Sequence, residues 1–212
     1  MGDADEKPVD ETIASGTEGS EESTDDESST GESSATETPA DQSSDFDLPA
    51  VLARLDDDST AETRRAIGEV RAVVEAEPTR CVPTVPKLRQ LLDEPRCEET
   101  GDVAYCLAEL ARVAPEDVAP SAPTIASFVE DADGTDGVAE GLRCLSEIAA
   151  ETPEAVIEHV DSVLVCLEET ENHRVRTTAV ETLQTLAAHA PEEFSDVQSS
   201  FDDVVVERPP SA

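Results

Sequence analysis

Thiols and imidazoles are the side chains in this chain of 212 residues that are best suited to chemistry. The thiols belong to Cys81, Cys97, Cys106, Cys144 and Cys166. No two of them form a CxxC pair, and no cysteine lies near a histidine at the spacing of a metal site. An odd number of thiols without a pairing pattern is typical of reduced cysteines in a cytoplasm. The sequence therefore predicts no disulfide framework, no metal site and no cofactor.

The other candidates for catalysis are isolated as well. His159, His173 and His189 lie in three different expected elements, and none has a histidine partner four residues away. The segment from Gly134 to Gly137 is typical of a polar turn rather than a phosphate-binding loop. Carboxylates are so frequent that no single pair of them is informative. We therefore expect no catalytic constellation and no enzymatic activity.

The charge of the chain is strongly negative, because 51 Asp and Glu face 14 Lys and Arg, which gives a formal net charge of −37. High charge with few large apolar residues predicts disorder. A carboxylate-rich surface also suits a very salty cytoplasm. At about 1 M salt the screening length falls to about 3 Å, so carboxylates farther apart than this no longer repel one another strongly. Residues 1–45, rich in Ser, Thr and acidic residues, are expected to be a disordered tail. The remainder combines an acidic surface with regular apolar periodicity, which is typical of a halophilic domain.

This charge argues against two classes of ligand. Nucleic-acid binding depends on Lys and Arg that neutralise phosphates, and no basic stripe is present. Anionic membranes attract the same cationic residues. The N-terminus has no apolar signal region, and no apolar segment approaches the roughly 18 residues of a membrane span. We expect a soluble, cytoplasmic protein that binds neither nucleic acid nor membrane, and whose partners are other proteins.

A repeat organises the chain after the tail. Four prolines, Pro78, Pro115, Pro153 and Pro191, are spaced by 37, 38 and 38 residues. Eight residues before them stand Val70, Leu107, Leu145 and Leu183, and ten residues after them stand Leu88, Ile125, Val163 and Phe201. Together with apolar neighbours three or four residues away, these positions predict one apolar helix face before each proline and another after it.

The repeat unit is therefore a first helix (helix A), a turn at the proline, a second helix (helix B) and a polar loop. The expected A helices are 61–76, 99–113, 138–151 and 175–189. The expected B helices are 79–93, 116–130, 154–169 and 192–206. The paired prolines at 83/86 and 120/123 are expected in the first turns of their helices, where N–H groups have no partner.

These helices predict an all-α fold. Residues 46–57 read as a lone helix B that caps the stack. The expected architecture over residues 46–206 is a right-handed α-solenoid of about four hairpins plus this N-terminal capping helix, because hairpins of this kind bury their apolar faces only against their neighbours. A short disordered C-terminus is expected at 207–212.

The junction of the last two repeats carries a family pattern. It consists of Val163, Leu167 and Glu168, followed by Val175, Arg176, Ala179, Leu183 and Leu186. This pattern resembles the HEAT-repeat family, including the short type grouped with phycobilisome-lyase-like repeats, and the acidity points to a haloarchaeal source. At the valine–arginine position the other repeats differ, with Glu62-Thr63, Glu99-Thr100 and Gly137-Val138. The resemblance implies protein binding, with the B helices on the concave side. It leaves a lyase-like enzyme or enzyme accessory factor as an alternative.

The lyase-like members raise the question whether a thiol carries chemistry in this chain. Cys106 and Cys144 occupy the same position in adjacent repeats. Neighbouring helices lie about 8–10 Å apart, whereas the Cα atoms of a disulfide lie about 4.4–6.8 Å apart. We therefore expect both cysteines to be small core residues. Cys97, in a loop, is expected to be the most exposed thiol and has no visible activating base.

The surface of the B helices that faces away from the core is the candidate binding site, which we call the predicted ridge. Its residues are Lys87, Gln90, Thr124, Ser127, Glu158, Ser162 and Val165. The ridge is low in charge compared with the rest of the chain, and a line of low charge density on an acidic surface predicts a contact site. The expected function is that of a protein–protein adaptor. A regulatory subunit whose acidic tail competes for a basic partner is a further possibility.

Overall fold

The computed structural model describes residues 46–95, 97–131 and 136–207. The chain divides into two units, residues 1–41 and 42–212, and all described residues belong to the second. The expected acidic tail at 1–45 and residues 208–212 of the expected C-terminal tail lie outside the described residues, so their expected disorder stays a prediction. Glu207, the first residue of that expected tail, is instead the last residue of a helix.

Every element within the described residues is helical, and the expectation of an all-α solenoid is confirmed. The first half contains α1 (Leu48–Leu55), α2 (Thr60–Val74), α3 (Pro78–Cys81), the 3₁₀ turn η1 (Val82–Thr84), α4 (Val85–Leu92), α5 (Thr100–Ala111), α6 (Pro115–Val118), the 3₁₀ turn η2 (Ala119–Ser121) and α7 (Ala122–Asp131). The second half contains α8 (Asp136–Glu151), α9 (Glu154–Ile157), α10 (Val160–Glu169), α11 (His173–His189), α12 (Pro191–Phe194) and α13 (Gln198–Glu207). Within the described ranges, no helix is both long and apolar enough to cross a membrane.

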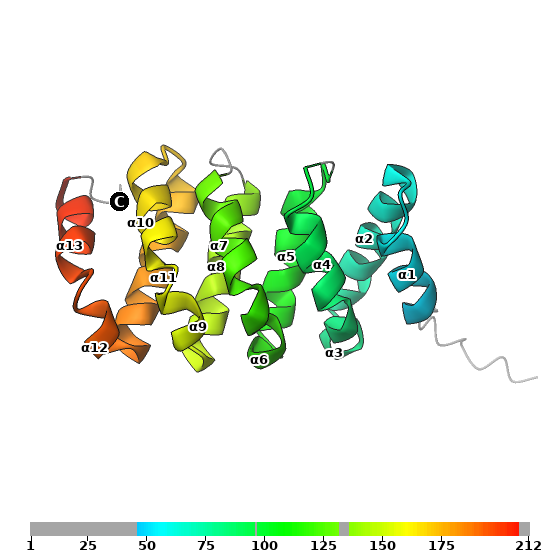
Figure 1. The fold of residues 1–212 in the computed structure, drawn as a ribbon, viewed down its shortest axis with the longest axis horizontal. Helices are drawn as coiled ribbons and strands as arrows, with labels where there is room; N and C mark the ends of the chain where they lie inside the picture. Colours follow the sequence, from blue (N-terminus) through cyan, green and yellow to red (C-terminus); the bar gives the residue numbers. More distant parts are fainter. Residues whose placement is uncertain (1–45, 96, 132–135, 208–212) are drawn as a thin grey trace, which may run out of the picture. The chain divides into compact units, whose positions relative to one another are not determined.

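The long helices form two rows, as Figure 1 shows. The A row consists of α2, α5, α8 and α11, and each of these helices packs on the next. The B row consists of α1, α4, α7, α10 and α13, and its members also contact their neighbours in order. The contacts of α8 with α5 and with α11 are the most extensive between helices of the stack. Each hairpin is therefore stabilised by the hairpins on either side of it.

The core lies between the two rows and uses the residues that the repeat marks. Val70, Leu107, Leu145 and Leu183 from the A row are completely buried. From the B row, Leu88, Ile125 and Val163 are buried, and Phe201 packs partly buried against the same core. Removing such apolar side chains from water contributes about 25 cal/mol per Å² of buried surface. The apolar periodicity thus decides which face of each helix turns inward.

The four B helices are not continuous, which corrects the expected ranges. Each begins with one short helical turn (α3, α6, α9 or α12) that packs against the preceding A helix, and a longer helix follows after a break. In the first two hairpins Pro86 and Pro123 stand in the first turns of α4 and α7, as expected. The third and fourth hairpins break at His159 and Val197 without any proline. Packing of the short turn on the A helix therefore accompanies the break in every hairpin, with or without proline.

Two glycines allow α5 and α8 to approach closely at their N-termini. A Cβ atom added to Gly137 would lie 2.9 Å from the Cα atom of Gly101, closer than carbon atoms approach without bonding. One turn further along α8, a Cβ on Gly141 would lie 3.3 Å from the ring of Phe128 on α7. The two α8 glycines thus make room for a neighbouring backbone and for an aromatic ring.

The arginine of the family pattern fixes the junction between α10 and α11. Arg176 is buried, and its Nη1 atom donates a hydrogen bond to the carbonyl oxygen of Leu167, 3.0 Å away near the C-terminus of α10. Thr63 holds the equivalent position in the first hairpin, and its hydroxyl donates to the carbonyl oxygen of Asp57 in the loop before α2 at 3.2 Å. In both hairpins a polar side chain donates a hydrogen bond to a carbonyl group near a helix end, where carbonyl groups lack a partner within the helix.

Ion pairs connect consecutive helices of the A row along their exposed surface. Arg143 on α8 pairs with Glu109 on α5 at 2.8 Å, and Arg174 on α11 pairs with Glu140 on α8. Tyr105 on α5 lies between two guanidinium groups, 4.4 Å from that of Arg71 and 5.6 Å from that of Arg143. Pairs at the surface contribute up to about 1 kcal/mol each. Their effect here is to set the register of neighbouring hairpins.

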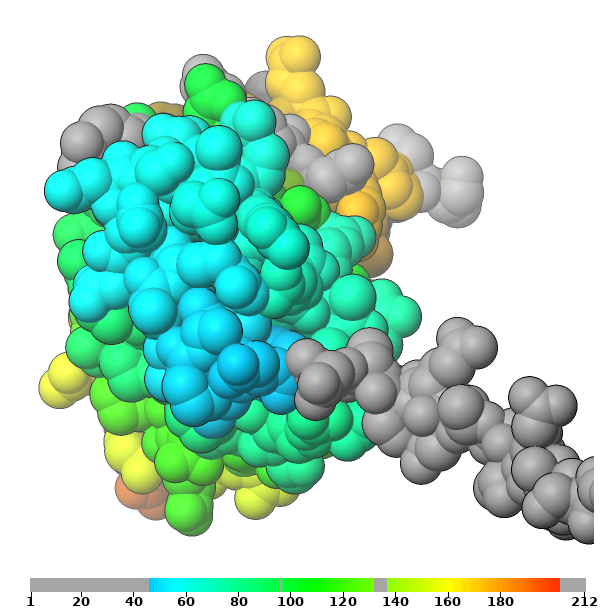
Figure 2. Space-filling view, turned by 90° about the vertical axis from the view of Figure 1, so that its right-hand side faces the viewer, coloured from blue at the N-terminus to red at the C-terminus, as the bar shows by residue number. Residues whose placement is uncertain are grey.

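The N-terminal end of the stack is closed by α1, as expected. Figure 2 looks at this end, where α1 and α2 cover the surface. Asp47 caps α1 by accepting the N–H of Ala50 at 3.3 Å, and Val51 turns into the core. Arg80 on α3 donates to the carbonyl oxygen of Phe46, and its guanidinium lies 5.4 Å from the centre of that phenyl ring. The capping helix is therefore held by the segment just before it as well as by its apolar face.

Candidate protein-binding surface

The predicted ridge runs over three successive helices of the B row. Lys87 and Gln90 belong to α4, Thr124 and Ser127 to α7, and Ser162 and Val165 to α10, while Glu158 stands at the end of α9. Gln90, Ser127 and Glu158 are exposed, and the other four side chains are partly exposed. The seven residues thus lie along one series of neighbouring helices. Whether a partner binds there stays a prediction.

Two polar residues of the ridge bind the neighbouring hairpin. The ammonium group of Lys87 pairs with Asp56, which caps the C-terminus of α1. The hydroxyl of Ser162 on α10 donates a hydrogen bond to Glu130 on α7 at 2.7 Å. These contacts link α1 to α4 and α7 to α10, so both residues connect adjacent hairpins as well as facing outward.

Thr124 and Ser127 share a hollow, which we call the α4–α7 groove. Its volume is about 380 Å³. It is lined by Leu92, Asp93, Glu94, Pro95, Cys97, Thr100, Thr124, Ser127, Phe128 and Asp131. Phe128 is half-buried, although its place in the repeat assigned it to the apolar core face. The only sequence signal that Phe128 also lines a groove is the rarity of aromatic residues, which make up 2% of the chain.

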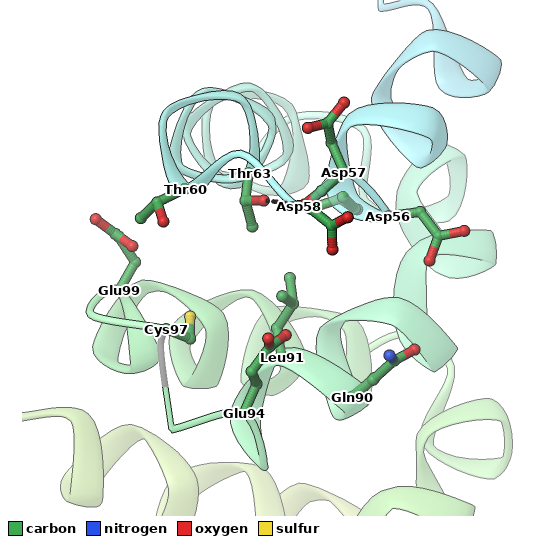
Figure 3. Close-up of a pocket in the computed structure, with 11 residues that line it drawn as sticks. Asp56, Asp57, Asp58, Thr60, Thr63, Gln90, Leu91, Glu94, Cys97 and Glu99 are labelled. Atoms are coloured by element: carbon green, nitrogen blue, oxygen red, sulfur yellow. Dashed lines mark hydrogen bonds between the residues drawn. The ribbon is translucent and has the colours of Figure 1, made fainter.

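A second hollow, the loop pocket, lies at the preceding junction and has a volume of about 240 Å³. Figure 3 shows Asp58 from the α1–α2 loop facing Leu91 and Glu94 across this space, with the sulfur atom of Cys97 directed toward it. Gln90 of the predicted ridge stands at one side of the pocket. The carboxylates that line the loop pocket do not converge on one point (Figure 3). Among the residues that the structure describes, no group of three or more His, Cys, Asp or Glu side chains is arranged to hold a metal ion.

The five cysteines are free thiols, and four of them are buried. Burial raises the pKa of Cys81 to about 11, that of Cys106 to about 12 and that of Cys166 to about 11. The pKa of Cys144, at the centre of the stack, is raised further by complete desolvation. Because the thiolate is the nucleophile, a raised pKa leaves these side chains unreactive near neutral pH.

Cys97 is half-buried between the two hollows and lines both of them. Burial raises its pKa also, with further contributions from the charges of Glu99 and Glu94, while a backbone hydrogen bond at Glu99 acts in the opposite direction. The loop thiol is thus the most accessible of the five, as expected, yet it is a weak nucleophile. The arrangement offers two small hollows with acidic rims rather than an activated group.

Comparisons with known proteins bear on the fold. No protein-family model matches the chain, and no curated protein matches it. Among solved structures it is similar to a designed armadillo repeat protein, YIII(Dq.V1)4CPAF, in complex with the peptide (KR)4. The TM-score is 0.68 at 16% sequence identity, and the match covers 78% of this chain and 75% of that one. At this identity the likeness shows the fold, a solenoid of helical repeats.

Proposed function

We propose that this chain is a scaffold that binds partner proteins through the predicted ridge on α4, α7 and α10. The observation that carries the proposal is the α4–α7 groove. It places Thr124, Ser127 and the half-buried ring of Phe128 in one hollow, on a chain whose net charge is −37. A partly apolar hollow on a surface dominated by carboxylates is a natural contact site for another protein.

The designed armadillo protein supports this function by its fold. That protein holds the peptide (KR)4, and a solenoid offers an extended surface on which a partner can contact several repeats at once. For the present chain, a partner that carries basic segments would suit the acidic surface, because complementary charges favour association and exclude wrong partners. We infer that the partner presents a basic segment to the ridge.

The finer identity that we propose is a HEAT-type adaptor from the cytoplasm of a halophilic archaeon. Arg176 supports the HEAT assignment, because it occupies the position that the family pattern gives to arginine and binds the carbonyl oxygen of Leu167. The acidic composition supports adaptation to high salt. A lyase-like activity would need an activated group, and the raised pKa values of all five thiols argue against a cysteine nucleophile.

The test is affinity capture at high salt from the organism that makes the protein. The wild type is compared with a triple variant, Gln90→Arg, Thr124→Arg and Ser162→Arg, which adds positive charge along the ridge. We expect stoichiometric protein partners on the wild type and at least a tenfold loss on the variant, because like charges brought together in an interface with a basic segment cost several kcal/mol.

The matched control changes the net charge by the same amount elsewhere. Val113, Gln184 and Ala188 are exposed residues on or next to the A row, and changing all three to Arg should leave capture intact. Both variants must keep the helical circular dichroism of the wild type. Equal capture by the wild type and the ridge variant would remove the ridge from the proposal.

A further inference from the structure

We propose that the α4–α7 groove binds an arginine side chain from a basic segment of the partner. This inference rests on the proposed function and names what one part of the ridge recognises. The groove has three features that suit a guanidinium group: an aromatic wall, an acidic rim and a position at the C-terminal ends of two helices. Each of them follows from described residues.

The aromatic wall is the ring of Phe128. Its position is fixed by the glycines of α8, since a Cβ atom on Gly141 would lie 3.3 Å from the ring and one on Gly137 would lie 3.5 Å from it. Leu92 and Pro95 complete the apolar lining. An arginine side chain can bury its methylene groups along such a lining and place its guanidinium against an aromatic ring.

The acidic rim is formed by Asp93 and Asp131, which are both exposed. Many other carboxylates of the repeat region form ion pairs within the chain, such as Asp56 with Lys87 and Asp102 with Arg71. Within the described part of the chain, no Arg or Lys pairs with Asp93 or Asp131. Two carboxylates beside an apolar hollow are therefore available to a cation from outside.

The ends of two helices strengthen the preference for a cation. Asp93 is the C-cap residue of α4, and Asp131 is the last residue of α7. The C-terminus of a helix carries a partial negative charge, which favours cations within the last turn. The dipoles of both helices thus act in the same direction as the two carboxylates.

Arginine fits these features better than lysine or a second copy of this chain does. Its planar, weakly hydrated guanidinium stacks on aromatic rings and binds two carboxylate oxygens together, whereas lysine is a strongly hydrated point charge. Short-range contacts of this kind persist at about 1 M salt, where screening acts beyond about 3 Å. A second copy of this chain would bring a surface of net negative charge against the acidic rim. We therefore assign the groove to arginine from a different protein.

The probe is a fluorescein-labelled peptide of four Arg-Gly pairs, measured by fluorescence anisotropy with the full chain at high salt. Peptides with lysine or with citrulline, the uncharged isostere, in place of arginine are compared with it. We expect the citrulline peptide to bind at least about tenfold more weakly, because charge-assisted bidentate bonds are lost. We expect the lysine peptide to fall between the two. Equal binding of the arginine and citrulline peptides would overturn the proposal.

Variants locate the binding in the groove. The double change Asp93→Asn with Asp131→Asn should weaken the arginine peptide about fivefold or more, and Phe128→Leu should weaken it about threefold. Ser127→Arg should abolish binding by placing a guanidinium of the chain itself at the groove. The control, Glu116→Gln with Asp117→Asn on α6, removes the same charge from an exposed helix that does not line the groove.

If the control weakens the arginine peptide as much as the rim variant does, the attraction is general charge and the groove assignment is wrong. A concentration-dependent dimer that Ser127→Arg dissociates would assign the groove to a second copy and would equally overturn it. The proposed function is tested separately by capture on the ridge variant. A captured partner together with an arginine peptide that fails to bind would reject the arginine assignment and leave the scaffold standing.

Discussion

The close approach of α5 and α8 predicts that replacing Gly137 by alanine destabilises the stack. The added methyl group would lie 2.9 Å from the Cα atom of Gly101 and 3.4 Å from its nitrogen, and both are backbone atoms that cannot rotate away. Carbon atoms in favourable contact lie about 3.5–4.0 Å apart, so the two helices must separate. Phe128, 3.5 Å from the same methyl group, would have to move as well.

The size of the effect follows from two opposed contributions. Alanine is favoured over glycine by up to about 1 kcal/mol in a helix interior, and by less at the second residue of α8. Forcing one extra carbon into a packed contact costs typically about 1–3 kcal/mol. We expect Gly137→Ala to lower the free energy of unfolding by about 1–2 kcal/mol. For a domain of this size that corresponds to a fall in Tm of roughly 2–8 °C.

Two other glycines provide matched controls. Gly101 is the second residue of α5, as Gly137 is of α8, but its added methyl group would lie 3.7 Å from the nearest atom, an ordinary contact. Gly101→Ala should therefore leave the Tm unchanged or slightly raised. Gly68 lies within α2 with nothing within 4 Å of the added carbon, so Gly68→Ala should stabilise by up to about 1 kcal/mol.

The assay is thermal unfolding at high salt followed by circular dichroism. The expected order of Tm is Gly68→Ala at or above wild type, Gly101→Ala near wild type and Gly137→Ala clearly below. If Gly137→Ala melts with or above Gly101→Ala, the two helices are not in the backbone contact described, and the reasoning from close approach is wrong.

Three further predictions concern single interactions and salt. Arg176→Ala should cost about 1–3 kcal/mol, measured by the same melts, because the buried carbonyl of Leu167 loses a donor. Tyr105, the only tyrosine in a chain without tryptophan, should titrate near pH 12 by tyrosinate absorbance, since its hydrogen bond to Glu75 raises its pKa to about 12, and Glu75→Gln should lower that midpoint. Because the folded pKa is the higher one, the stability from this bond is complete below pH 10 and is lost as the pH rises to about 12. Transfer to about 0.1 M salt, where charges act over about 10 Å, should reduce helicity and open the buried thiols to a thiol reagent; unchanged reactivity and Tm there would contradict halophilic adaptation.

The A helices could be predicted from the sequence to within about two residues. The expected range 138–151 compares with Asp136–Glu151 for α8, and 175–189 with His173–His189 for α11. These helices have one apolar face with a regular spacing, which is a local signal. The prediction was wrong in making the B helices continuous. The break at His159 could not be predicted, because no proline marks it and the packing of α9 on α8 leaves no signal in the local sequence pattern.

The candidate site was predictable only in part. The repeat placed Thr124 and Ser127 on the outer surface of a B helix, and the structure finds both at one hollow. Phe128 was assigned to the core, because its offset from the proline matches buried Leu91 in the preceding hairpin. It does pack against the core, but it is only half-buried and lies against the glycines of α8. Which apolar residue also lines a hollow depends on the shape of the neighbouring hairpin.

The amino-acid sequence by itself determined the helical repeat, the face of each long helix that turns inward and the acidic surface. All of these follow from residue type and spacing along one chain. Only the tertiary structure decided where the B helices break, which arginines pair with which carboxylates, and that Asp93 and Asp131 flank one hollow. Those features arise from contacts between hairpins, and they depend on side-chain shape and helix spacing that periodicity does not encode.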